Sequence, residues 1–182
     1  MMSDFDKQRP AFGFDLDGTL FSIKLILKRF SQITGKEMSF ENMTKYSMAE
    51  TFGLTEDQEY EIFSKIKDDV NLNSKPLKKT VELTHRLAAQ NCPIIIITAR
   101  RQNAFEETSK ALELAGIKYD QIFMNANEKA DIIMENNIGR YFDDQGQLIE
   151  KMMDHPVSKS CEMTLIDAPY NQGFNCDSRM FV

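Results

Sequence analysis

The sequence has no tryptophan, little proline and cysteine, and no long hydrophobic run. No stretch of 18 or more apolar residues occurs, so no membrane-spanning helix is expected. Residues 1–9 are polar and contain no apolar stretch, so no secretory signal is expected either. Cys92, Cys161 and Cys176 are an odd number and lie far apart, which argues against a disulfide framework or a zinc site. We therefore expect three reduced thiols in a cytoplasmic protein.

Positively charged residues are outnumbered by negatively charged ones. The 182 residues include 22 Lys and Arg against 28 Asp and Glu, a formal net charge of −6. This acidic balance argues against a large nucleic-acid-binding surface, so nucleic acid is not the expected partner. A hydrophobic content of 42% supplies a core, and the length suits one domain with a modest insertion. The oligomeric state is left open.

Strand and helix patterns alternate along most of the chain. The run of four isoleucines within residues 93–98 cannot alternate between two environments, so this strand is expected to be buried on both faces. An alternation of strands with helices of this length predicts an α/β fold with a three-layer, Rossmann-like parallel sheet. The predicted strands are 11–15, 93–98, 121–124, 140–142 and 162–166, and the predicted helices between them are 77–90, 103–116, 128–137 and 145–154.

The stretch 22–75 interrupts this alternation and is predicted to be wholly helical. Ile23, Ile26, Leu27 and Phe30 have the spacing of one helix face, and Gly35 is expected to end that helix. A capping box at residues 55–58 opens a second helix to about residue 70, and a loop is expected over 71–76. We interpret residues 22–75 as a helical cap inserted into a core formed by residues 1–21 and 76–182.

Polar residues that can carry chemistry follow the predicted strands. Ligands of open parallel sheets bind beyond the carboxyl ends of the strands, so such residues are expected to converge. Singly, each has a structural interpretation as a turn, cap or solvated residue, but their joint occurrence in this order favours a shared site. They are Asp15 and Asp17 in the motif Asp-Leu-Asp-Gly-Thr, Thr98 after the isoleucine strand, Lys129 near a helix start, and Asp143 and Asp144 after residues 140–142.

These residues supply the chemical groups that phosphoryl transfer needs. Two carboxylates from different strands can hold Mg²⁺, a hard cation that prefers oxygen ligands. The cation and a lysine would neutralise a bound phosphoryl group, while hydroxyl and backbone N–H groups would bind its oxygens. One carboxylate can attack phosphorus as a nucleophile, and a second can act as general acid and then as base.

The residues Asp15-Leu-Asp-Gly-Thr-Leu20, Thr98, Lys129 and the Asp143-Asp144 pair resemble the four motifs of the haloacid dehalogenase (HAD) superfamily of phosphotransferases. The helical insertion resembles that superfamily's small cap. The segments 97–101, 119–122 and 167–171 are further similar to the 5'(3')-deoxyribonucleotidase branch and its bacterial nucleotidase relatives. The similarity runs from about residue 11 to 175.

The resemblance implies roles for the acidic residues. Asp15 would be the nucleophile and Asp17 the general acid and base. Mg²⁺ would be bound by the Asp15 carboxylate, the Asp17 backbone carbonyl and Asp144, with Asp143 behind it or as the alternative ligand.

The resemblance also implies the phosphate-binding groups. Thr98 and Lys129 would hold the phosphoryl group, with Ala99 offering its backbone N–H. Arg100 and Arg101 are candidates for contacts with the substrate, and a structural salt bridge is an equal alternative for each.

The expected function is a Mg²⁺-dependent phosphomonoesterase with an aspartyl-phosphate intermediate, acting on a small phosphorylated substrate. A (deoxy)nucleoside monophosphate is favoured. The alternatives are a polynucleotide 3'-phosphatase, another small-metabolite phosphatase, and a non-catalytic phosphate-binding module. Relatives usually continue past residue 171 with a tryptophan-containing segment and a final helix, whereas eleven residues follow here, so closure of the core at this end is left open.

Overall fold

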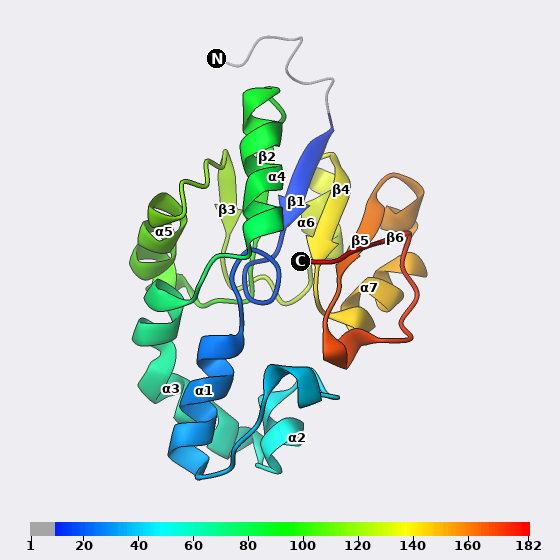
Figure 1. Ribbon diagram of the computed structural model, residues 1–182. Coiled ribbons are helices and arrows are strands. Elements are labelled where there is room, and N and C mark those ends of the chain that lie inside the picture. The colour runs from blue at the N-terminus through cyan, green and yellow to red at the C-terminus, as the bar shows by residue number, and fades with distance from the viewer. Residues whose placement is uncertain (1–9) are drawn as a thin grey trace.

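The computed structural model describes residues 10–182, so the expectation about a signal in residues 1–9 lies outside the described residues. A single sheet of six parallel strands forms its centre, in the order β3-β2-β1-β4-β5-β6 (Figure 1). The strands are β1 (Ala11–Phe14), β2 (Ile94–Ile97), β3 (Gln121–Phe123), β4 (Ile138–Asp143), β5 (Glu162–Ile166) and β6 (Ser178–Met180). The predicted parallel α/β fold is confirmed.

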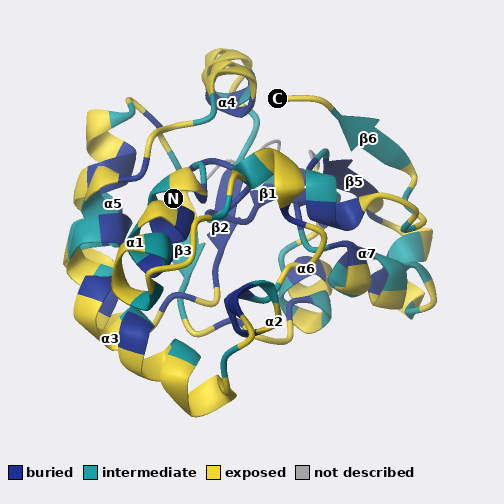
Figure 2. Cartoon of the chain, turned by 60° about the horizontal axis from the view of Figure 1, so that its bottom comes forward, coloured by how far each residue is buried: buried dark blue, intermediate teal, exposed yellow. Residues whose placement is uncertain are grey.

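Helices cover both faces of the sheet and bury two apolar clusters. Ile94 and Ile96 pack with residues of α4 and α5, whereas Ile95 and Ile97 pack with residues of α6 and α7. The isoleucine strand is therefore buried on both faces, as its unbroken run predicts. Figure 2 shows the contrast between this buried strand and the exposed outer faces of the helices. The helices are α4 (Lys78–Ala89), α5 (Phe105–Leu114), α6 (Ala130–Glu135) and α7 (Gly146–Met153).

The chain between β1 and α4 forms a helical unit at one end of the sheet (Figure 1). We call residues 22–75 the cap and the remaining described residues the core. The cap helices α1, α2 and α3 share an apolar cluster, which two core residues, Ala168 and Tyr170, also join. The cap thus packs on the core through the loop after β5. The helices are α1 (Lys24–Thr34), α2 (Met48–Phe52) and α3 (Glu56–Asn73).

The two segments that link the cap to the core run side by side. The Ser22 N–H donates to the Lys75 carbonyl at 2.8 Å, and the Leu77 N–H donates to the Leu20 carbonyl at 2.8 Å. The chain therefore leaves and re-enters the core at one place. This pairing supports the proposed division at residues 22 and 75.

The structure contains the helix end and the capping box that the cap sequence predicts. Gly35 ends α1 in the left-handed conformation with φ 70°. Thr55 and Gln58 form the predicted capping box at the start of α3, with bonds of 3.3 and 2.9 Å.

Two expectations about the cap differ from the structure. The predicted loop from Asn71 was wrong at its first residues, because α3 continues to Asn73. The Asn73 side chain donates to Asp69 one turn earlier in the helix at 2.9 Å, and the Asn71 carbonyl accepts a bond from Arg100 of the core, so one local and one tertiary contact stabilise the extra residues. The expectation that the whole stretch is helical was also wrong, because residues 35–39 and 43–47 lie outside the helices, and α2, with five residues, is too short to show a helical period.

Strand β6 closes the core after residue 171, where the sequence leaves the end of the sheet open. It pairs in parallel with β5, and the Asp167 N–H donates to the Met180 carbonyl at 2.8 Å. Arg179 on this strand contacts Asp167 at 3.0 Å and the Asn171 side chain at 2.9 Å. The short C-terminal segment therefore fixes the loop 167–171.

The strand order also locates the expected site. Strand β1 lies at the centre, and the chain first adds β2 and β3 on one side and then β4 on the other. A sheet whose strand order reverses in this way opens a crevice beyond the carboxyl ends of the two central strands. Those ends belong to β1 and β4 and are followed by Asp15 and Asp144.

Candidate active site

Three aspartates meet beyond the ends of β1 and β4. Asp15 follows β1, Asp143 ends β4 and Asp144 follows it. One carboxylate oxygen of each lies within 4.8 Å of the others, and all three side chains are buried. The sheet thus brings together residues that are more than 120 positions apart in the chain.

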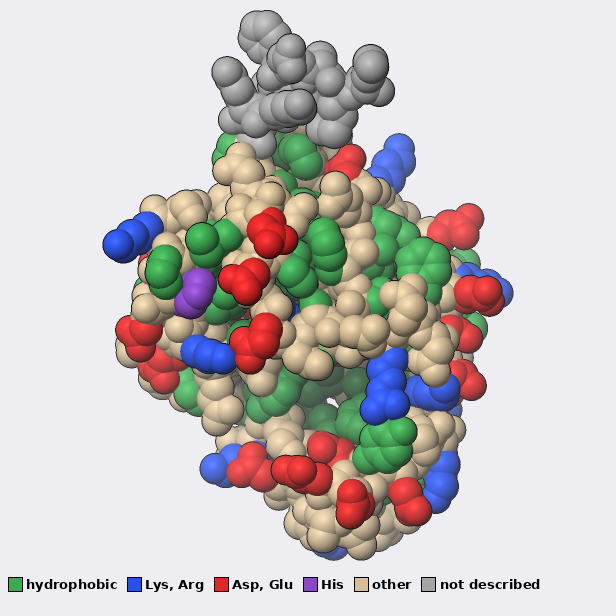
Figure 3. Space-filling model, turned by 180° about the vertical axis from the view of Figure 1, so that it is seen from behind, with side chains coloured by type: hydrophobic (Ala, Val, Ile, Leu, Met, Phe, Trp, Pro, Cys, Tyr) green, Lys and Arg blue, Asp and Glu red, His purple; other side chains and the backbone are tan. Residues whose placement is uncertain are grey.

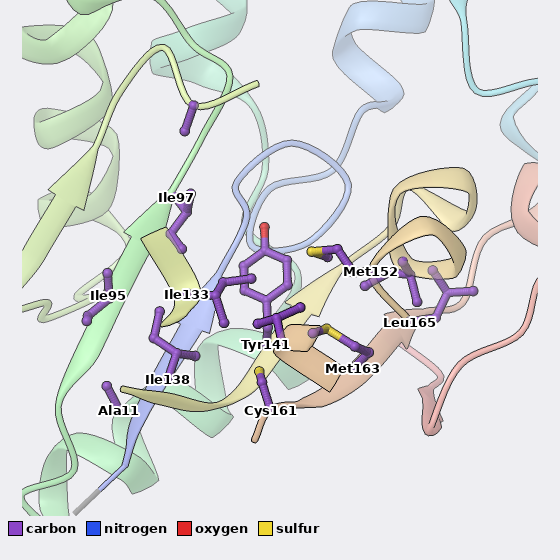
Figure 4. Packing of buried hydrophobic residues seen from close by; sticks show 13 residues of the cluster. Ala11, Ile95, Ile97, Ile133, Ile138, Tyr141, Met152, Cys161, Met163 and Leu165 are labelled. Atoms are coloured by element: carbon purple, nitrogen blue, oxygen red, sulfur yellow. The ribbon is translucent and has the colours of Figure 1, made fainter. Parts of the chain in front are cut away.

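The Asp143 carboxylate is fully engaged by protein groups. Its Oδ2 accepts bonds from Lys129 Nζ at 2.8 Å and from the Tyr141 hydroxyl at 2.7 Å, and its Oδ1 accepts the Gln145 N–H at 2.8 Å. In Figure 4 the Tyr141 ring lies in the apolar cluster of the sheet and its hydroxyl points toward the loop after β1. Asp143 is therefore held as part of the protein's own hydrogen-bond network.

Asp144 is held differently. Its Oδ2 accepts a short bond from the Tyr170 hydroxyl, whereas its Oδ1 is buried and has no hydrogen-bond partner. Asn171 donates to the Asp144 backbone carbonyl at 2.8 Å and fixes the main chain. A Cβ at Gly18, where φ is +88°, would lie 2.1 Å from Asp144 Oδ2. The glycine of the Asp-Leu-Asp-Gly-Thr motif thus makes room for this carboxylate.

Burial and mutual repulsion make the ionised cluster costly without a cation. Burial raises the pKa of Asp15 from 3.8 to about 7, although the nearby Lys129 lowers it in part. Burial, together with Asp143 and Asp15, raises the pKa of Asp144 well above its ordinary value. A divalent cation would offset both effects by favouring the ionised carboxylates.

The residues present fit a divalent cation. One carboxylate oxygen each of Asp15, Asp143 and Asp144 lies within 4.8 Å of the others, so these oxygens are close enough together to share one hard cation. The unpartnered Oδ1 of Asp144 is a buried oxygen in need of a positive partner. Asp144 is thus better suited than the fully engaged Asp143 to be the ligand beside Asp15.

Asp17 is not one of the three clustered aspartates, and its carboxylate pairs with Arg100. Arg100 Nε and Nη2 donate to the two carboxylate oxygens at 2.8 and 2.7 Å. The Asp17 side chain is 31% exposed, whereas that of Arg100 is 5% exposed. The structure therefore places Arg100 on a predicted catalytic carboxylate rather than in the solvent.

Of the predicted phosphate-binding residues, Lys129 lies beside the acidic cluster, and Thr98 and Ala99 follow β2. Lys129 precedes α6, is buried, and its Nζ lies 2.7 Å from Asp15 Oδ1. Burial lowers the pKa of this ammonium, but the nearby Asp143 and Asp15 carboxylates outweigh that effect and raise the pKa above its ordinary value. Lys129 therefore stays charged. Thr98 follows β2 and is buried, and its hydroxyl accepts the Arg100 N–H at 3.1 Å. Ala99 is exposed at the adjoining cavity.

A cavity of about 450 Å³ lies between cap and core beside Asp17. Figure 3 shows the molecule hollowed where its two parts meet. Arg101 is exposed there, stacks on the Tyr60 ring at 4.9 Å and donates to its hydroxyl at 3.1 Å. The cavity has an apolar wall and a polar, cationic rim, and its lining includes Ile26, Tyr60, Phe63, Lys67, Val70, Asn71, Ala99, Arg100 and Arg101.

Sequence reasoning missed the groups that hold the acidic pair in place. Tyr141 and Tyr170 donate their hydroxyls to Asp143 and Asp144, and Asn171 fixes the main chain of Asp144. The segment 167–171 does follow a predicted strand, so its position at the same edge of the sheet was the available signal. The hydrogen bonds depend on side-chain directions that spacing does not reveal.

Comparison with known proteins agrees with this geometry. No family model matches the chain. A curated protein of Bacillus cereus named "Putative nucleotidase" is 28% identical over 174 residues, which cover 90% of this chain and 89% of that protein. Another from Halalkalibacterium halodurans, "Putative nucleotidase BH1399", is 20% identical over 167 residues, 91% of this chain and 84% of that protein.

A solved structure has the same fold as this chain. The crystal structure of a HAD family hydrolase from Deinococcus radiodurans, with bound phosphate and sodium, matches with a TM-score of 0.65 at 10% identity. The match covers 96% of this chain and 91% of that one. This chain therefore shares the fold of that hydrolase. The predicted resemblance is thus confirmed, and the curated relatives agree with its nucleotidase type.

Among residues 10–182, no helix has both the length and the apolar character needed to cross a membrane.

The acidic cluster predicts a pH-dependent stability that Mg²⁺ changes. Between pH ~4 and 7 the folded protein retains protons on Asp15 and Asp144 that the unfolded chain has released. The melting temperature in EDTA should therefore fall as the pH rises through this window. With saturating Mg²⁺, which favours the ionised form, the fall should be smaller. Differential scanning fluorimetry from pH 4 to 8 measures both curves, and parallel curves would contradict a cation at this cluster.

Proposed function

We propose that the chain is a Mg²⁺-dependent phosphomonoesterase that works through an aspartyl-phosphate on Asp15. The observation that carries the proposal is the buried cluster of Asp15, Asp143 and Asp144 with one unpartnered Asp144 oxygen and the ammonium of Lys129 beside it. With Asp17 and Arg100 included, the site holds four carboxyl groups and two cations, so a phosphate ester would meet excess negative charge once all four carboxyl groups are ionised. A divalent cation resolves that conflict.

The proposed roles follow from position. Asp15 attacks phosphorus and Lys129 and Thr98 bind the phosphoryl oxygens, together with the Ala99 N–H. Asp17 gives a proton to the leaving oxygen and then takes one from the attacking water. Mg²⁺, when bound by the Asp15 and Asp144 carboxylates and the Asp17 backbone carbonyl, would neutralise charge on the phosphoryl group.

The cavity between cap and core supports a nucleoside as the leaving group. Its volume of about 450 Å³ lies within the usual range for small-molecule sites, ~300–1,000 Å³. Phe63 and Tyr60 offer aromatic surface for a base, while Ser64, Asn71 and Asn103 offer polar groups for a sugar. The two nucleotidase-named relatives point the same way. We therefore favour (deoxy)nucleoside monophosphates as substrates and, given the unpaired cysteines, a cytoplasmic location.

A phosphate-release assay tests the proposal. The purified protein, treated with EDTA and then given Mg²⁺, is tested on nucleoside 5'- and 3'-monophosphates, sugar phosphates and a 3'-phosphorylated oligonucleotide. We expect release that requires Mg²⁺ and is fastest with nucleoside monophosphates. Absence of release from every ester would contradict the phosphatase, whereas a preference for sugar phosphates would contradict the nucleotide substrate alone. Preference for the oligonucleotide, weakening steeply with salt, would favour the polynucleotide phosphatase.

A further inference from the structure

Arg100 occupies both oxygens of the Asp17 carboxylate. Its Nε donates to Oδ2 at 2.8 Å and its Nη2 donates to Oδ1 at 2.7 Å. A planar guanidinium paired in this two-point manner fixes the carboxylate's orientation as well as its position. The Asp17 carboxylate would otherwise be free to rotate, because it is 31% exposed at the cavity.

The other end of the guanidinium is anchored to two different parts of the molecule. Arg100 Nη1 donates to the Asn71 carbonyl in cap helix α3 at 3.1 Å and to Thr108 Oγ1 in core helix α5 at 3.1 Å. The Arg100 backbone N–H is held by Thr98 Oγ1. One buried side chain thus joins the cap, the core and a predicted catalytic carboxylate.

We propose that Arg100 is a positioning residue, which aligns Asp17 for proton transfer to the leaving group and makes that alignment depend on the docked cap. The inference rests on the proposed phosphatase function. Proton transfer needs its donor within hydrogen-bond reach of the leaving oxygen, and small misplacements of catalytic groups cost large factors in rate. Because the Asn71 carbonyl belongs to the cap, an undocked cap would remove one of the contacts that hold Arg100 in place.

This role differs from the substrate contact that the sequence left open for Arg100. Four of its five N–H groups are committed to Asp17, Asn71 and Thr108, so a phosphate ester would have to displace one of them. Its neighbour Arg101 points to the cavity and remains the candidate for contact with substrate.

The test compares two esters of similar size that differ in leaving group. Benzyl phosphate releases an alcohol and needs a proton donor, whereas p-nitrophenyl phosphate releases a stable phenolate and needs it much less. The measured quantity is kcat/KM, because it covers the steps up to leaving-group departure and excludes later hydrolysis of the phosphoenzyme. The variants are Asp17→Asn, Arg100→Ala, Arg100→Lys and the double variant Asp17→Asn/Arg100→Ala.

Arg29→Ala is the matched control. It removes another arginine–carboxylate pair to the same cap helix, the 2.6 Å contact with Asp69, without touching Asp17. We expect it to change kcat/KM for both esters by one common factor.

Asp17→Asn should lower kcat/KM for benzyl phosphate by about 10²–10³-fold and for p-nitrophenyl phosphate by about 10-fold or less. Arg100→Ala should reproduce this selective loss, and the double variant should be no worse than Asp17→Asn alone. Arg100→Lys, which keeps the charge but loses the fork, should show the same selectivity to a smaller extent. It carries the test if Arg100→Ala does not fold.

Two results would overturn the inference and leave the proposed function standing. One is an equal loss for both esters in the Arg100 variants, which is the signature of a structural role. The other is an additive loss in the double variant, which would mean that Arg100 acts independently of Asp17. Failure of the unmodified protein to release phosphate from either ester with Mg²⁺ would instead overturn the proposed function and, with it, this inference.

Discussion

Asp15→Asn is expected to lower phosphate release by at least ~10⁴-fold while the protein stays folded. The asparagine amide cannot act as the nucleophile that forms the acyl phosphate. The same position also supplies a predicted cation ligand and holds Lys129 at 2.7 Å, so three contributions are lost together. The melting temperature in EDTA should not fall, because burial already disfavours the ionised form of this side chain.

Asp120→Asn is the matched control for this substitution. Asp120 accepts the Ile94 N–H at 2.7 Å at the start of β2, at the opposite end of the strands from the acidic cluster. Steady-state phosphate release should stay close to that of the unmodified protein. Mass spectrometry of a rapidly quenched reaction should find a phosphoryl adduct in the control and none in Asp15→Asn. Full turnover by Asp15→Asn would remove Asp15 from the nucleophile's role.

The architecture could be predicted from the sequence because its signals are local and repeated. Four isoleucines in β2 and the alternation of helices with strands indicate a parallel sheet, and the carboxyl ends of its strands must share one edge. Asp15 and Asp144 were expected at that edge for this reason alone. Their proximity is a consequence of topology, so it needs no knowledge of side-chain directions.

The partners of the site residues could not be predicted in the same way. The pairing of Arg100 with Asp17 spans 83 positions and depends on rotamers and on how the cap docks. Sequence spacing left Arg100 equally suited to bind substrate or to form a salt bridge, and the hydroxyl of Tyr170 gave no sign that it reaches Asp144. Strand β6 is likewise three residues long, too short for a period-2 pattern to emerge.

Asp144→Asn is expected to make the metal-free protein more stable and to weaken its stabilisation by Mg²⁺. The unpartnered Oδ1 and the repulsion from Asp15 and Asp143 make this carboxylate costly when no cation is bound. Neutralising it should raise the melting temperature in EDTA by about 2–8 °C, for ~1–2 kcal/mol gained. Mg²⁺ at about 100 times its Kd should stabilise the unmodified protein by ~2.7 kcal/mol, roughly 5–11 °C, and the variant much less.

Asp143→Asn provides the contrast, because the adjacent carboxylate is engaged by Lys129, Tyr141 and the Gln145 N–H. An amide at position 143 would turn an N–H group toward these donors and would leave the buried Lys129 ammonium without its second carboxylate. The melting temperature in EDTA should therefore fall by about 6–12 °C, for ~3 kcal/mol lost. The two neighbouring substitutions should therefore shift stability in opposite directions, as scanning calorimetry with and without Mg²⁺ would measure. If Asp143→Asn loses the Mg²⁺-dependent shift while Asp144→Asn keeps it, the assignment of the ligand is reversed. The unpartnered oxygen of Asp144 would then need a different physical explanation, since a buried carboxylate oxygen without any donor is otherwise a net cost to the fold.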